Sequence, residues 1–257
     1  MHRNRLTLVA IAVASLSALP RAQSADTPVD LNAQAPRTPF DDKPDLSGVW
    51  ENVTPETATE LVTLNDTPYA TFEDIGSGYR IGLPLHPWAA LLKSSRRQVR
   101  AASGAAATRR DSTCGPFSTP QFNARESPRT IVHAPGTVAI RYAAQRGTRR
   151  IFTDGRPPLA RDSPPLALGY SRGAWRDDTL VVLTTNYPDD VWLDMNGSPL
   201  TRSGRTIERF RRVSVGTLEI EQTVDDPKAY QRPFTTRLTW RLVPDGERLE
   251  NRCVDGG

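Results

Sequence analysis

The feature that most constrains this chain is a two-residue alternation of side-chain character near its C-terminal end. In residues 217–224 (TLEIEQTV), every second side chain is Thr or Glu, and those between are Leu, Ile, Gln and Val. The same alternation returns in residues 237–242 (RLTWRL). Because successive side chains of a strand point to opposite faces, the pattern predicts strands with one buried and one exposed face. The short connection at residues 214–216 favours antiparallel neighbours.

From residue 128 onward, the chain repeats short β-rich segments separated by Gly, Pro or Asp. Such a meander is typical of sheets that close on themselves. We therefore predict a mainly all-β fold, an antiparallel β-barrel or a strongly curved sheet. A first strand opens at Gly48–Trp50, and the later strands are predicted at residues 129–134, 137–143, 149–153, 167–175, 179–186, 205–214, 217–225, 234–243 and 247–252.

One helix is predicted, at residues 87–102. Trp88, Leu91 and Val99 recur at helical spacing, and Pro87 suits the first turn of a helix. The helix precedes most of the strands.

The N-terminal residues 1–24 have the pattern of an export signal, because Arg3 and Arg5 precede an apolar run that ends in small residues. Such leaders are removed. The run is shorter than the roughly 20 apolar residues that a membrane-spanning helix needs. We expect a disordered lead-in at residues 25–44 and a single domain at residues 45–257, exported to the periplasm or the extracellular space.

The charge of the chain gives no support for a nucleic-acid partner. The full sequence carries a formal charge of +4, but loss of the leader leaves 30 basic against 29 acidic residues. Nearly all basic residues are arginines, which fits a base-composition bias better than a phosphate-binding surface. We expect no nucleic-acid partner and no membrane span, and the sequence does not indicate an oligomeric state.

Cysteine and histidine usage argues against a metal or cofactor. Cys114 and Cys253 enter an oxidising compartment, where such a pair typically forms a disulfide. His86 and His133 are far apart, and no H-x-x-x-H or C-x-x-C spacing occurs. We expect no bound metal and no cofactor.

Residues 169–173 (GYSRG) match the G-x-S-x-G pattern of serine hydrolases. A nucleophile elbow needs a helix directly after the serine. Here residues 174–182 have the pattern of a strand end, a turn and a second strand, and both His86 and His133 lie upstream of Ser171. The motif therefore favours a structural role, in which the glycines let a bulky neighbour pack against a hairpin.

In a barrel, catalysis and ligand binding depend on polar side chains that point inward or line the mouth, where a dry environment shifts their pKa values. The weak catalytic candidates are Tyr170, Ser171, Asp154 and Glu208. The candidate ligand-binding residues are Arg156, Tyr170, Arg172, Asn186, Tyr187 and Trp192. Trp192 lies in a long connection, residues 188–197, that we expect to cap the barrel mouth.

Two resemblances follow from the motifs. Gly48-Val49-Trp50 at the first strand resembles the G-x-W opening of the lipocalins and the wider calycin group, which implies a lipocalin-like barrel. The second resemblance is to a set of secreted bacterial proteins and covers nearly the whole exported chain. Its motifs are Pro44–Trp50 (PDLSGVW), Leu83–Leu92 (LPLHPWAALL), Cys114-Gly115-Pro116, Asp154-Gly155-Arg156, Gly169–Thr185, Glu208–Phe210 and Asp225–Pro227.

The second resemblance implies the β fold, a periplasmic location and bridged cysteines, and no particular activity. Where the pattern of that set has histidines, this chain has Tyr170, and Thr201 or Ser203. A histidine-based activity is therefore not expected here.

Three functions fit the sequence. The first is an exported lipocalin-like protein whose barrel holds a small apolar or amphipathic molecule, oriented by inward polar residues. The second is a barrel enzyme, an isomerase, cyclase or hydrolase, that uses acid–base residues in the pocket. The third is an envelope-associated structural or interaction protein. The sequence does not decide whether the protein is an enzyme.

Overall fold

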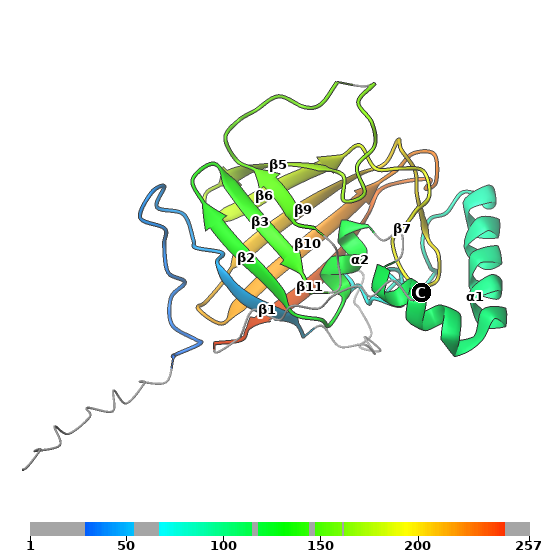
Figure 1. Ribbon diagram of the computed structural model, residues 1–257, viewed down its shortest axis with the longest axis horizontal. Coiled ribbons are helices and arrows are strands. Elements are labelled where there is room, and N and C mark those ends of the chain that lie inside the picture. Colours follow the sequence, from blue (N-terminus) through cyan, green and yellow to red (C-terminus); the bar gives the residue numbers. More distant parts are fainter. Residues whose placement is uncertain (1–28, 54–66, 115–117, 144–146, 161, 245–257) are drawn as a thin grey trace, which may run out of the picture.

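The computed structural model describes residues 29–53, 67–114, 118–143, 147–160 and 162–244, with the backbone alone over residues 103–114. Its main body is a closed β-barrel (Figure 1). The strand order is β1-β11-β10-β9-β6-β5-β4-β3-β2, and β2 pairs with β1 to close the barrel. The strands are β1 (Gly48–Asn52), β2 (Arg129–Ala134), β3 (Thr137–Tyr142), β4 (Arg149–Phe152), β5 (Tyr170–Arg176), β6 (Thr179–Thr185), β9 (Arg205–Arg212), β10 (Thr217–Asp225) and β11 (Phe234–Leu242). The mostly β fold predicted from the alternation is confirmed.

The alternation decides which side chains fill the barrel. In β10, Ile220 is 1% exposed and lies opposite Leu238 of β11, which is equally buried. The outward residues of the same strand form cross-strand ion pairs, such as Glu219 with Arg211 of β9 at 2.6 Å. The hydrophobic core therefore lies inside the barrel, and the ion pairs between neighbouring strands face solvent.

The predicted strand boundaries agree closely with the structure. β2 and β10 have the predicted bounds, and the other strands that can be compared begin and end within three residues of the prediction. The strand predicted at residues 247–252 lies outside the described residues. A small hairpin of β7 (Val191–Trp192) and β8 (Pro199–Leu200) is not predicted, because strands of two residues show no alternation.

Helix α1 (Pro87–Cys114) begins where the sequence predicts and extends twelve residues beyond the predicted end at residue 102. The extension includes residues 105–107, which are all Ala, the best helix former. The polar residues around them give no helical period, so the predicted helix ends earlier. Figure 1 shows α1 beside the barrel rather than within it. Basic side chains attach it to neighbouring loops, with Lys93 3.3 Å from Asp74 and Arg100 2.9 Å from Glu73.

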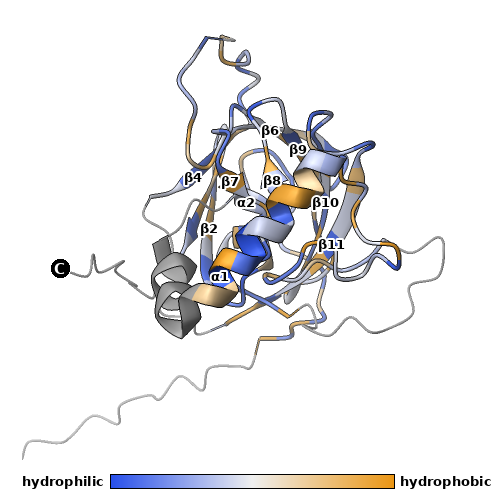
Figure 2. Cartoon of the chain, turned by 90° about the vertical axis from the view of Figure 1, so that its right-hand side faces the viewer, coloured by the Kyte–Doolittle hydropathy of each residue, from blue (hydrophilic) through white to orange (hydrophobic). Residues whose placement is uncertain are grey.

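A second helix, α2 (Thr119–Ala124), closes one end of the barrel. All six of its residues are buried, and Figure 2 shows it within the ring of strands. The backbone carbonyl of Asn123 accepts a hydrogen bond from the Trp240 indole at 3.0 Å, and that of Ala124 accepts one from the Asn52 side chain at 2.9 Å. The sequence does not predict this plug helix, because six residues are too few to show a helical period.

The opposite end of the barrel is covered by residues 29–47, which we call the N-terminal strap. The backbone N–H of Gly216 donates to Leu31 at 2.8 Å, and Arg37 pairs with Asp178 at 2.8 Å. The described part of the predicted lead-in is thus folded against the barrel. Its Pro-rich, non-periodic sequence gives no sign of this, because the contacts are backbone bonds and single ion pairs.

The disulfide predicted between Cys114 and Cys253 cannot be compared with the structure, because Cys253 and the side chain of Cys114 lie outside the described part of the chain. Among the described residues, no helix combines the length and the apolar character needed to cross a membrane.

His133 is the most unusual buried group at the strap end. Its ring lies between Trp175, stacked at 5.5 Å, and Phe40, edge-on at 5.3 Å. Asp41 and Asp45 each approach one ring nitrogen to 3.9 Å, which is too far for a hydrogen bond. Burial lowers the pKa of His133 below its usual value, and the two carboxylates and the Pro44 carbonyl offset this only in part.

This burial predicts a pH dependence of stability. The unfolded chain takes up a proton at His133 near pH 6.5, whereas the folded chain does so only at a lower pH. Stability from the neutral ring is therefore complete above pH 6.5 and falls as the pH drops. Urea unfolding at pH 7.5 and 5.5 should show a smaller loss in His133→Phe, which keeps the aromatic packing, than in wild type. An equal loss in both proteins would contradict this account.

Candidate functional site

The weakest seam of the barrel lies between β4 and β5. Among the described strands these are the only barrel neighbours that run parallel, and their paired positions there are Ile151 with Ser171 and Phe152 with Arg172. β5 and β6, by comparison, pair over seven residues. A parallel pair needs a long connection, and its described parts, residues 153–160 and 162–169, form the arch above the barrel in Figure 1. The β4 residues before Ile151 do not pair with β5, so side chains take the place of backbone hydrogen bonds between the two strands there.

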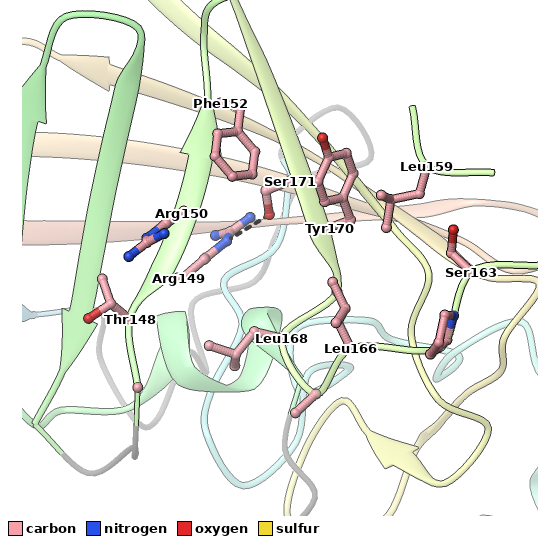
Figure 3. A pocket seen from close by; sticks show the side chains of 14 residues that line it. Thr148, Arg149, Arg150, Phe152, Leu159, Ser163, Leu166, Leu168, Tyr170 and Ser171 are labelled. Atoms are coloured by element: carbon pink, nitrogen blue, oxygen red, sulfur yellow. Dashed lines mark hydrogen bonds between the residues drawn. The ribbon is translucent and has the colours of Figure 1, made fainter. Parts of the chain in front are cut away.

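A pocket of about 680 Å³ opens at this seam, and we call it the seam pocket (Figure 3). Figure 3 shows Phe152 and Arg149 of β4 facing Tyr170 and the leucines of the connection, and Arg150 at the edge of the pocket on the other side of β4. Its lining is Gly147, Thr148, Arg149, Arg150, Phe152, Leu159, Ser163, Pro164, Leu166, Ala167, Leu168, Gly169, Tyr170 and Ser171.

The walls of the seam pocket are mostly apolar. Leu159 and Leu166 are 37% and 42% exposed, which is high for large aliphatic side chains, and both face the pocket from the connection. Leu168 continues this wall toward the hydrophobic core, against which it packs. Exposed apolar side chains gathered around a concavity are typical of a binding site.

Several contacts hold the connection in position over the pocket. Asn186 has a left-handed backbone (φ 63°), and its side chain donates to the Pro164 carbonyl at 2.6 Å. Its own carbonyl accepts from the Leu166 N–H at 3.0 Å. Arg202 donates to the Ser163 carbonyl at 3.0 Å. The four prolines of the connection restrict its backbone further, so the pocket is largely formed without a ligand.

The floor of the pocket is a buried ion pair. Arg149, on β4, is 2% exposed and donates to the Glu208 carboxylate of β9 with both terminal nitrogens, at 2.9 Å for the pair Nη1–Oε1. Its Nε donates to the Ser171 hydroxyl at 3.1 Å, and Nη2 also donates to Thr184 at 2.9 Å. Burial alone would lower the pKa of Arg149, but Glu208 outweighs it and raises the pKa, so the guanidinium stays charged.

The ion pair also holds the plug helix. Asn123 of α2 donates to Glu208 Oε1 at 2.6 Å and accepts from the Tyr142 hydroxyl at 2.8 Å. Thr119, at the start of α2, shares a 2.7 Å hydrogen bond with the Tyr187 hydroxyl. Burial raises the pKa of Tyr187 to about 12, so its hydroxyl remains neutral. The hydrogen-bond network therefore joins the barrel to the plug helix, and its two charges, on Arg149 and Glu208, offset each other.

Four predicted site residues meet at or beside the pocket. Tyr170 and Ser171 line it, and Arg156 stacks over Phe152 with its guanidinium carbon 3.6 Å from the ring centre. Arg172 donates to the Arg156 carbonyl at 3.4 Å on the outer face of the barrel.

The other predicted residues lie elsewhere or have other partners. Glu208 is held by Arg149 behind the pocket, and Tyr187 belongs to the plug network. Asp154 is an exposed partner of Arg156, whose hydrogen bonds lower the pKa of Asp154 to about 2. Trp192 lies under Arg96 of α1, whose guanidinium carbon is 5.0 Å from the centre of the tryptophan ring. It does not line the pocket.

The two glycines of the G-x-S-x-G motif have structural roles. Gly169 has a positive φ of 67°, and a Cβ there would lie 2.6 Å from the Thr184 side chain. A Cβ on Gly173 would lie 3.0 Å from side-chain carbons of both Ile151 and Leu180. β5 continues to Arg176 after the serine, so no strand-to-helix corner forms.

The residues that the sequence analysis missed are Arg149, Arg150 and the leucines of the connection. A signal for Arg149 existed, because alternation in the predicted strand 149–153 places it on the same face as the apolar Ile151. A buried arginine is commonly paired with a buried carboxylate, and Glu208 was already a candidate. The leucines gave no signal, since they stand in a Pro-rich segment without periodicity.

Two further findings bear on the chemistry of the site. No group of three or more His, Cys, Asp or Glu side chains in the described ranges is arranged to hold a metal ion. Comparisons with family models, with curated proteins and with solved structures found no match. The geometry of the seam pocket is therefore the main indication of function.

The buried pair predicts a large effect of a small substitution. Glu208→Gln keeps the shape of the side chain but leaves the Arg149 charge uncompensated, which should lower the free energy of unfolding by about 3–5 kcal/mol. Glu221→Gln is the matched control, because Glu221 pairs with Arg209 at 3.2 Å on the exposed face. Exposed pairs contribute about 1 kcal/mol or less. Urea unfolding measures both, and similar losses in the two variants would refute the assignment.

Proposed function

We propose that this protein is an exported, lipocalin-like binder of a small apolar or amphipathic molecule, and that the molecule occupies the seam pocket. The observation that carries the proposal is the ordered concavity of about 680 Å³ with exposed leucines on its wall. Export rests on the leader pattern of residues 1–24, and the lipocalin likeness rests on Gly48-Val49-Trp50.

The position of the ligand differs from the position expected from sequence. We expected the barrel interior to hold the ligand, but Trp50 and Trp240 are fully buried there, and the plug helix occupies one end. The seam pocket instead lies where β4 and β5 separate. Its volume falls within the range of roughly 300–1,000 Å³ that is typical of small-molecule sites.

The alternative of an isomerase, cyclase or hydrolase needs an ionisable group that can exchange a proton with a ligand. Both oxygens of Glu208 accept bonds from Arg149, and the Ser171 hydroxyl accepts another. Groups engaged in this way support a structural role and favour binding over catalysis. An envelope-associated interaction protein would have no need of an apolar pocket held in position by Asn186 and Arg202.

The test uses N-phenyl-1-naphthylamine, a neutral apolar dye whose fluorescence rises when it leaves water. Wild type should bind it at one site, and the double variant Leu159→Ser/Leu166→Ser should bind about tenfold more weakly, since two partly buried leucines contribute about 1.4 kcal/mol or more.

The matched control is Val132→Ser/Val213→Ser, which also replaces two exposed aliphatic side chains, 48% and 40% exposed, at positions that do not line the pocket. It should bind the dye as wild type does. Equal weakening in the two double variants, or no binding by wild type, would contradict the proposal.

A further inference from the structure

The seam pocket is unevenly charged. Its fourteen lining residues include two arginines, Arg149 and Arg150, and no Asp or Glu. The charge of Arg149 is offset inside the barrel by Glu208 at 2.9 Å. The net positive charge at the pocket therefore comes from Arg150.

Arg150 is placed to meet a ligand. It follows Arg149 on β4, so its side chain leaves the opposite face of the strand, and it is exposed while still lining the pocket. Within the described ranges, no carboxylate forms an ion pair with it. An exposed guanidinium at the edge of an apolar pocket keeps its five donors for an incoming anion.

The charged groups around the connection add to this asymmetry. Asp154, beside the pocket wall, is already paired with Arg156 at 2.6 Å. Arg202 donates to the Ser163 carbonyl at 3.0 Å, which brings a further positive charge to the same loop. Asp162 precedes Ser163 but does not line the pocket.

We propose, on the basis of the binding function above, that the ligand is an amphipathic anion with a carboxylate or sulfonate head. The apolar body lies against Leu159, Leu166 and Tyr170, and the head pairs with Arg150. A bidentate guanidinium–carboxylate contact at the edge of a low-dielectric wall gives orientation as well as affinity.

The test compares two dyes that differ only in the anionic group. 8-Anilino-1-naphthalenesulfonate is N-phenyl-1-naphthylamine with a sulfonate added, so the ratio of their dissociation constants reports the contribution of the head. Wild type should prefer the sulfonate dye. Arg150→Gln should reduce that preference by about three- to tenfold, and added salt should weaken only the sulfonate dye in wild type.

The control is Arg176→Gln, because Arg176 is also an exposed arginine of the seam strands but stands at the far end of β5, outside the pocket lining. It should leave the preference unchanged. If both dyes bind and Arg150→Gln leaves the ratio unchanged, the anionic head is overturned while the binding function stands. If neither dye binds wild type, the binding function fails, and this inference fails with it.

Discussion

A single buried guanidinium holds the barrel together where its backbone pairing is weakest. β4 has four residues and only two paired positions with β5, yet Arg149 links it to β5, β6 and β9 through Ser171, Thr184 and Glu208. Because the guanidinium is planar and carries five donors, one side chain can fix three strands at once. The same carboxylate then holds the plug helix through Asn123.

The pocket follows from this arrangement. A parallel step in an otherwise antiparallel barrel requires the long connection 153–169, and separated strands leave room for that connection's apolar side chains. The side-chain network closes the barrel behind the seam, so the seam pocket is lateral and separate from the barrel interior. Arg149 belongs both to the buried network and to the floor of the seam pocket, so the same side chain supports the barrel and shapes the pocket.

The fold could be predicted from sequence because alternation is a local signal. Strands such as β10 and β11 carry it over six or more residues, and their bounds agree with the prediction to within one residue. The plug helix, the strap and the arch could not be predicted, since their positions depend on long-range contacts such as Asn123 with Glu208 and Leu31 with Gly216. Of the candidate site residues, Tyr170 and Ser171 line the pocket, but the leucines that form its wall carry no local pattern.

Amide hydrogen exchange, resolved by residue, with and without N-phenyl-1-naphthylamine would show whether the dye occupies the seam pocket. We expect the dye to slow exchange in β4 and in the connection around Leu166, and to leave exchange in β10 and β11 unchanged. Slowed exchange confined to α1 or to the N-terminal strap, with none at the seam, would contradict this expectation.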